Sequence, residues 1–195
     1  MRIGIDLDDT ICRTTEIVNK KLNSYAKKNN LNVLDIMNDE DLKYDFFKEN
    51  IIDIYRNVEV KRDVYHVLKR LKSRGNEIYV VTARGNTIVP DGEGVYEVTK
   101  EWLDRNNISV DGIFIGAYGE NKAEVCKEND IDLMIDDDPY NYKKVISLGI
   151  NCLLFDDHGR FNLEKDYEFT FECNFDISNE KLKLLREHGV NRLSF

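Results

Sequence analysis

Five short apolar runs, separated by segments with helical spacing of apolar residues, limit this chain to one class of fold. The runs lie at 2–5, 77–82, 112–116, 132–135 and 151–155. They are apolar along their length and do not alternate with polar residues, which is typical of strands buried on both faces of a parallel sheet. We therefore predict an α/β fold in which helices cover both faces of a parallel sheet.

The segments between the runs carry helix signals. We predict helices over 13–30, 61–74, 95–107, 121–129, 140–148 and about 178–188, with short helices in the polar, aromatic-rich segment 31–59. Thr14 or Thr15 is the expected N-cap of the first helix, and Gly75 is the expected stop of the second. The stretch FTFECNF (169–175) is expected to be an edge strand or a folded-back loop.

Composition narrows the function classes. The chain has 195 residues and is 42% hydrophobic, which suffices for one sizeable core. Its net charge of −9, without a basic block, disfavours a nucleic-acid polymer as partner. Four cysteines without a CxxC pair indicate free thiols in a reducing compartment. With neither a signal-peptide pattern nor an apolar run long enough to cross a membrane, we expect a soluble cytoplasmic protein. The sequence makes no prediction about oligomeric state.

Carboxylates and phosphate-binding side-chain types follow three of the predicted strands. DLDDT (6–10) follows the first, TAR (82–84) ends the second, and DDDP (136–139) follows the fourth, while Lys122 opens the helix before that fourth strand. Carboxyl ends of parallel strands share one edge, where ligands gather. Because residues i and i+2 of an extended chain face the same side, Asp6 and Asp8 should point to one place and Asp9 elsewhere.

This cluster predicts chemistry on a phosphate. Converging carboxylates are costly without a cation, and Mg²⁺ prefers oxygen ligands. Asp6 could attack phosphorus to form an aspartyl-phosphate, and Asp8 could protonate the leaving oxygen and later deprotonate water. Thr82, Arg84 and Lys122 could hold the phosphate and neutralise the charge that grows on it.

DLDDT, VVTAR (80–84), Lys122 and LMIDDDP (133–139) resemble, in order and spacing, the four motifs of the haloacid dehalogenase (HAD) superfamily over about residues 1–155. The resemblance implies a Rossmann-like core with Asp6 as nucleophile and Asp8 as acid/base. It also implies Mg²⁺ bound by the Asp6 carboxylate, the Asp8 backbone carbonyl and a carboxylate of the Asp136–Asp137 pair, with Asp137 favoured as the direct ligand.

The same resemblance implies a domain division and a substrate. Residues 13–59 look like the small helical cap of the superfamily, inserted after the first strand of a core formed by 1–12 and 60–195. The motif order also looks like the 5′-nucleotidase and 5′(3′)-deoxyribonucleotidase branch. We therefore expect a Mg²⁺-dependent phosphomonoester hydrolase for a small phosphorylated metabolite, with a 5′-(deoxy)nucleotide as the favoured substrate.

Other interpretations stay open at this point. The substrate could be a sugar phosphate or another small organic phosphate, and the chain could instead be a phosphorylation-dependent switch or a non-catalytic nucleotide-binding protein. Taken alone, Asp6 or Asp8 could be a helix cap, and Lys100 or Lys127 could be confused with Lys122. The aromatic residues of the cap are more often core than a platform for a nucleobase; they are Tyr44, Phe46, Phe47 and Tyr55.

Overall fold

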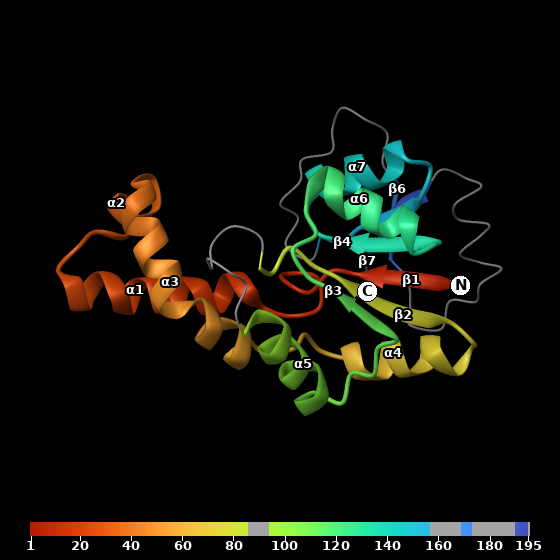
Figure 1. Cartoon of the computed structure of the whole chain (residues 1–195), viewed down its shortest axis with the longest axis horizontal. Coiled ribbons are helices and arrows are strands. Elements are labelled where there is room, and N and C mark those ends of the chain that lie inside the picture. Colours follow the sequence, from red (N-terminus) through yellow and green to blue (C-terminus); the bar gives the residue numbers. More distant parts are fainter. Residues whose placement is uncertain (86–93, 157–168, 173–189, 195) are drawn as a thin grey trace.

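The computed structural model describes residues 1–85, 94–156, 169–172 and 190–194 (Figure 1). Five parallel strands form one sheet in the order β3-β2-β1-β4-β5. Their bounds are β1 Arg2–Ile5, β2 Glu77–Val81, β3 Gly112–Phe114, β4 Leu133–Asp136 and β5 Asn151–Leu154. The predicted α/β fold with a parallel sheet is confirmed.

Helices cover both faces of this sheet (Figure 1). The helices are α1 Thr14–Asn29, α2 Val33–Asn38, α3 Glu40–Asn57, α4 Val64–Ser73, α5 Val95–Arg105, α6 Gly119–Glu128 and α7 Pro139–Ser147. In Figure 1, α6 and α7 lie on one face and α4 and α5 on the other, while α1–α3 project away from the sheet. Gly75 has a φ of 80° just beyond α4, as its predicted role as a helix stop requires.

Two expectations need correction. Neither Thr14 nor Thr15 is the N-cap of α1: Arg13 precedes the helix and makes no side-chain cap bond. The Asp9 carboxylate instead accepts the Thr15 backbone N–H at 2.9 Å. The segment 31–59 contains one short helix, α2, and one long helix, α3, where only short helices were expected. Long α3 forms because its apolar residues can pack against both α1 and α5.

The C-terminal part holds a second, two-stranded parallel sheet. It pairs β6 Phe169–Glu172 with β7 Val190–Ser194, and only β6 had a sequence signal. The predicted helix at 178–188 and residues 173–175 of FTFECNF lie outside the described residues. Within the described part of the chain, no helix has both the length and the apolar character needed to span a membrane.

The apolar side chains form separate clusters around the sheet and in the projecting helices. The sheet cluster includes Ile5, Val80 and Trp102, and Trp102 is almost fully buried. The cluster of the projecting helices contains Phe46 of α3 together with Val98 of α5. The helical extension (α1–α3) therefore shares a core with α5. The division into a 13–59 cap and a core remains a prediction.

A hydrogen bond from Trp102 connects the two regions. Its indole Nε1 donates to the backbone carbonyl of Val58, the residue that follows α3, at 2.8 Å. We predict that Trp102→Phe lowers the free energy of unfolding by about 1–3 kcal/mol, because it removes the donor to this buried acceptor. Urea denaturation measures the change. Tyr96→Phe, at an exposed position of the same helix, is the control and should stay near wild type. Equal stability of Trp102→Phe and wild type would contradict this account of the connection.

Candidate active site

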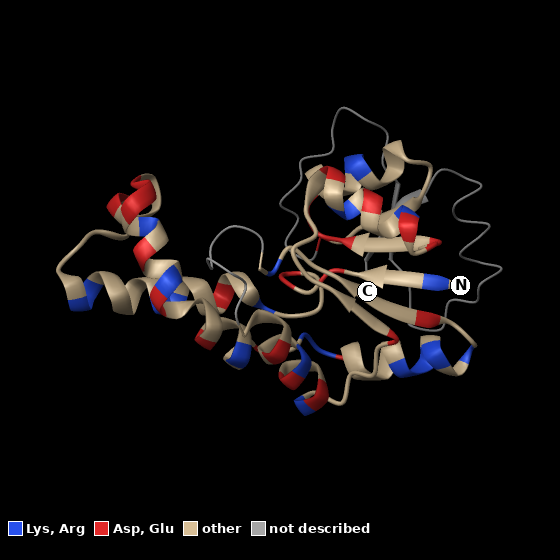
Figure 2. Ribbon diagram, in the orientation of Figure 1, with Lys and Arg blue, Asp and Glu red and all other residues tan. Residues whose placement is uncertain are grey.

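The strand order gives the sheet one topological switch point at its carboxyl edge. The chain builds β1, β2 and β3 toward one side and then crosses to β4 and β5 on the other. The direction therefore changes between β1 and β4, and ligands bind at such switch points in open α/β sheets. Asp6 follows β1, and Asp136 is the last residue of β4. Figure 2 shows acidic residues at the ends of both strands.

Lys122 joins these two acids. Its Nζ lies 2.9 Å from Asp6 Oδ1 and 2.6 Å from Asp136 Oδ2, and all three side chains are buried. Burial opposes the charge of Lys122, but the adjacent Asp6 and Asp136 carboxylates outweigh it and raise the lysine pKa. Lys100 and Lys127, the other sequence candidates, are exposed. Lys122 is thus the lysine that the fold brings to the acids.

Asp136 is fully engaged by protein donors. Its Oδ1 accepts the Asp138 N–H at 2.9 Å, and Asn141 Nδ2 approaches the same oxygen at 3.2 Å. The Asn141 side-chain oxygen accepts the backbone N–H of Gly119 at 2.9 Å, which connects the starts of α6 and α7. Sequence reasoning missed Asn141. Its signal was an amide two residues after Pro139, in the first turn of the helix that follows the acids.

Asp8 is paired with Arg84. Arg84 Nη2 lies 2.8 Å from Asp8 Oδ1 and Nε lies 3.0 Å from Oδ2, a bidentate arrangement, and the Thr14 hydroxyl donates to Oδ1 at 2.6 Å. Burial would raise the pKa of Asp8, but the Arg84 charge and these hydrogen bonds lower it below the usual value for aspartate. Asp8 is therefore ionised in this arrangement.

Arg84 is itself buried, and one nitrogen of its guanidinium group has no hydrogen-bond partner among the described residues. The guanidinium carbon lies 4.3 Å from the centre of the Tyr55 ring, which belongs to α3. Among the described residues, its Nη1 is buried without a hydrogen-bond partner. A buried donor on a charged group is costly when unsatisfied, so this nitrogen suits an anionic ligand such as a phosphate oxygen.

The other predicted residues take different positions. Thr82 is fully buried, and its hydroxyl accepts the backbone N–H of Arg84 at 3.4 Å. Asp137 lies beside the DLDDT loop, where its Oδ1 accepts the Thr10 hydroxyl at 3.3 Å. Asp9 has a φ of 57° and turns to the start of α1. The third carboxylate of DLDDT thus serves the helix, as its expected direction away from Asp6 and Asp8 implies.

The charges around Asp6 suit an additional cation. Burial raises the pKa of Asp6, Lys122 lowers it, and the neighbouring Asp136 and Asp8 raise it, with a net shift well above the ordinary value. Lys122 Nζ donates to Asp6 Oδ1 at 2.9 Å, so one cation is already shared between Asp6 and Asp136. A bound cation would favour the ionised form that a nucleophile needs.

The donor set is compatible with magnesium. Within the described residues, no three His, Cys, Asp or Glu side chains are grouped as a metal site. The expected donors are two carboxylates, Asp6 and Asp137, and the Asp8 backbone carbonyl, and Asp137 contacts Thr10 of the loop that carries Asp6 and Asp8. These are hard oxygen ligands, and Mg²⁺ commonly takes one or two carboxylates and completes its shell with water and substrate phosphate. The residues present fit the ion.

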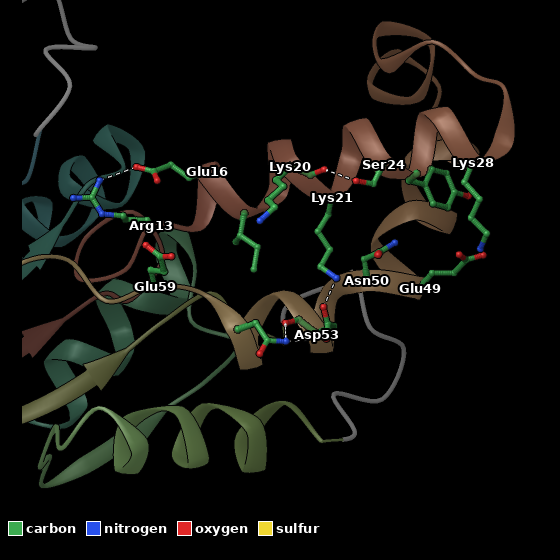
Figure 3. A pocket seen from close by; sticks show the side chains of 13 residues that line it. Arg13, Glu16, Lys20, Lys21, Ser24, Lys28, Glu49, Asn50, Asp53 and Glu59 are labelled. Atoms are coloured by element: carbon green, nitrogen blue, oxygen red, sulfur yellow. Dashed lines mark hydrogen bonds and ion pairs between the residues drawn. The ribbon is translucent and has the colours of Figure 1, made fainter.

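A charged groove lies in the helical extension and not at this site. It has a volume of about 710 Å³ and runs between α1 and α3 (Figure 3). Figure 3 shows Lys21 of one helix reaching Asp53 of the other, and Arg13 and Glu59 line one end. None of the candidate catalytic side chains line the groove. The site is therefore assigned from side-chain geometry and not from cavity size.

Comparison with known proteins supports the fold. No protein-family model and no curated protein sequence matches the chain. Among solved structures, a haloacid dehalogenase-like hydrolase family protein from Streptococcus pneumoniae has a TM-score of 0.58 at 10% identity, covering 98% of this chain and 92% of its own. CbbY from Rhodobacter sphaeroides, in complex with xylulose-(1,5)bisphosphate, has a TM-score of 0.54 at 12% identity, covering 78% and 84%.

A third similar structure is also a hydrolase of the HAD superfamily. A HAD-superfamily hydrolase of subfamily IA from Geobacter sulfurreducens has a TM-score of 0.52 at 12% identity, and the match covers 78% of this chain and 88% of that one. At these identities the likeness concerns the fold. The chain therefore has the fold of the HAD-like hydrolases.

The Lys122 bridge makes a prediction about stability. Lys122→Met should lower the free energy of unfolding by about 3–5 kcal/mol at neutral pH, because Asp6 and Asp136 then face each other buried and unpaired. Without Lys122 the pKa of Asp6 rises further, so the folded state binds more protons than the unfolded state. The deficit should therefore shrink as the pH falls toward 4 and grow as it rises.

Urea denaturation across this pH range, with chelator present, measures the effect. Lys127→Met, at an exposed position of the same helix, is the matched control and should change little at any pH. A deficit of Lys122→Met that does not vary with pH would contradict the assigned charges.

Proposed function

We propose that this protein is a Mg²⁺-dependent phosphomonoester hydrolase that acts through an aspartyl-phosphate on Asp6. The observation that carries the proposal is the meeting of two acids and two cations at the switch point. Asp6 and Asp8 follow β1, Arg84 follows β2, and Lys122 lies on α6, so residues far apart in sequence converge beyond the sheet edge. Convergence of this kind is unnecessary for capping a helix, and Asp9 already has that task.

In the first step, an oxygen of Asp6 attacks phosphorus and the bond from phosphorus to the leaving oxygen breaks. Lys122 contacts Asp6 and would balance the negative charge of the transferred phosphoryl group. The unpartnered Arg84 Nη1 would donate to a phosphate oxygen. Asp8 would give the leaving oxygen its proton.

The ion pair between Arg84 and Asp8 affects this step, because Asp8 must be protonated before it can act as an acid. Asp8 is ionised while it holds Arg84, so it is then a base and not an acid. We infer that the substrate phosphate competes with Asp8 for Arg84, which frees Asp8 to take up the proton that it donates. In the second step, Asp8 removes a proton from water, the water attacks phosphorus, and inorganic phosphate leaves with Asp6 restored.

Asp6, Asp137 and the Asp8 carbonyl would hold Mg²⁺. When bound, the ion would offset the negative charge of the phosphate and orient it toward Asp6. Asp136 is less suited as a direct ligand because Asp138, Asn141 and Lys122 already use its oxygens. Its proposed role is to hold Lys122.

For the substrate, we favour a 5′-(deoxy)nucleotide. The reasons are the order of the four motifs along the chain and the small size of the helical extension. A sugar phosphate is the second candidate, since the structurally similar CbbY is bound to a sugar bisphosphate. A phosphorylation-dependent switch would keep the phosphate on Asp6, and a non-catalytic protein would bind nucleotides without turnover.

The nucleophile is tested by substitution. Asp6→Asn should reduce phosphate release by at least about 10³-fold, because an amide does not form the acyl-phosphate. Phosphate release is measured with Mg²⁺ on nucleotides, sugar phosphates and p-nitrophenyl phosphate. Asp9→Asn is the matched control, since asparagine still caps α1, and its turnover should stay near wild type.

The outcomes separate the alternatives. Full turnover by Asp6→Asn would remove Asp6 from the reaction. A stable phosphoenzyme after treatment of the wild type with acetyl phosphate would favour the switch. Nucleotide binding without any release would favour the binding protein, and turnover of sugar phosphates alone would favour the second substrate class.

The metal is tested by titration. A chelator should abolish activity, and added Mg²⁺ should restore it. Asp137→Asn should raise the Mg²⁺ concentration for half-maximal activity by about tenfold or more, because it weakens one ligand, whereas Asp9→Asn should leave it unchanged. Full activity in chelator would contradict the metal, and an unchanged Mg²⁺ requirement of Asp137→Asn would contradict this ligand.

A further inference from the structure

Two exposed tyrosines stand next to the candidate site. Tyr118 and Tyr140 each expose 42% of their surface. Their ring centres are 5.6 Å apart, and the ring planes are tilted by 34°. The pair therefore offers neighbouring aromatic surfaces to the solvent at one place.

The turns that hold the site also hold the rings. Tyr118 is the residue before α6, and its carbonyl accepts the backbone N–H of Lys122 at 3.4 Å. Tyr140 lies next to Asn141, which contacts Asp136 and the backbone of Gly119. α6 follows β3 and α7 follows β4, so both rings start from the carboxyl edge where Asp6 lies.

Gly119 makes room for this pair. Its φ is +58°, and a Cβ at this position would lie 2.7 Å from Tyr140 Cε1. A larger residue would push the Tyr140 ring away from the start of α6. Lys144 also contacts the ring, with its Nζ 5.2 Å from the ring centre. Tyr140 is thus held in place while much of it remains exposed.

The aromatic residues of the helical extension are less suited to contact a substrate. Phe46 is fully buried and Tyr55 is 8% exposed, and Tyr55 faces Arg84. Tyr44 is exposed on α3, and its ring contacts Lys48 of the same helix and not a residue of the candidate site. Among the residues that the structure describes, Tyr118 and Tyr140 at the starts of α6 and α7 are exposed aromatic residues next to site residues in the chain.

We propose that Tyr118 and Tyr140 form a stacking platform for the nucleobase of a nucleotide substrate. The base belongs to the nucleoside, which is the leaving group of the reaction. This inference rests on the proposed function, because it assumes that a phosphate ester is bound at Asp6. It assigns the preference for nucleotides over sugar phosphates to the core and not to the helical extension. Stacking tolerates different bases, so the platform should favour nucleotides as a class.

The test measures binding and not turnover. In the full-length Asp6→Asn protein with Mg²⁺, calorimetry compares adenosine 5′-monophosphate with ribose 5-phosphate, which lacks the base. We expect roughly tenfold tighter binding of the nucleotide. With Tyr118→Ala and Tyr140→Ala added, this advantage should be lost while ribose 5-phosphate binds as before. Phenylalanine at both positions should keep it, because stacking needs the ring and not the hydroxyl.

Tyr65→Ala, at an exposed tyrosine of α4, is the control and should keep the full preference. Equal binding of the two ligands, a preference that survives both alanines, or no binding of either ligand would overturn the platform. A nucleotide preference that depends on the tyrosines, in a protein whose wild type releases no phosphate, would leave the platform standing and contradict the hydrolase. Phosphate release by the wild type, without a nucleotide preference that depends on the tyrosines, would support the hydrolase and contradict the platform.

Discussion

The rest of the site depends on the pairing of the buried Lys122 ammonium with two carboxylates. A charge removed from water is tolerated only when it is paired, and Lys122 has Asp6 on one side and Asp136 on the other. This pairing requires β1 beside β4 and α6 across their ends, which the strand order provides. It also requires that Asp136 stay in place, and Asn141 and the Asp138 backbone hold it there.

The two carboxylates of the DxD motif have different environments although only one residue separates them. Asp6 shares Lys122 with a second acid and its pKa is raised, whereas Asp8 has Arg84 largely to itself and its pKa is lowered. Pairs of titratable groups whose surroundings move their pKa values apart are a frequent feature of catalytic sites. At Asp6, burial and the charges of Asp136 and Asp8 outweigh Lys122, whereas at Asp8 the Arg84 charge and the hydrogen bonds outweigh burial.

The strands and most helices could be predicted because continuous apolar runs and helical spacing are local signals. Lys122 was found for another reason, its order among the motifs, since an isolated lysine gives no signal of burial. The pairing of Arg84 with Asp8 was not predicted, because it joins residues 76 positions apart and depends on side-chain direction. The capping of α1 by Asp9 depends on a left-handed backbone conformation, and Asn141 and strand β7 depend on tertiary contacts.

The core that the helical extension shares with α5 restricts how the extension can move. Val95 and Val98 of α5 are buried among side chains of α1–α3. A swing of the extension on its two connections would either carry α5 along or expose these valines, at about 1.5–3 kcal/mol for each side chain. The extension is thus better described as fixed to α5 than as freely hinged.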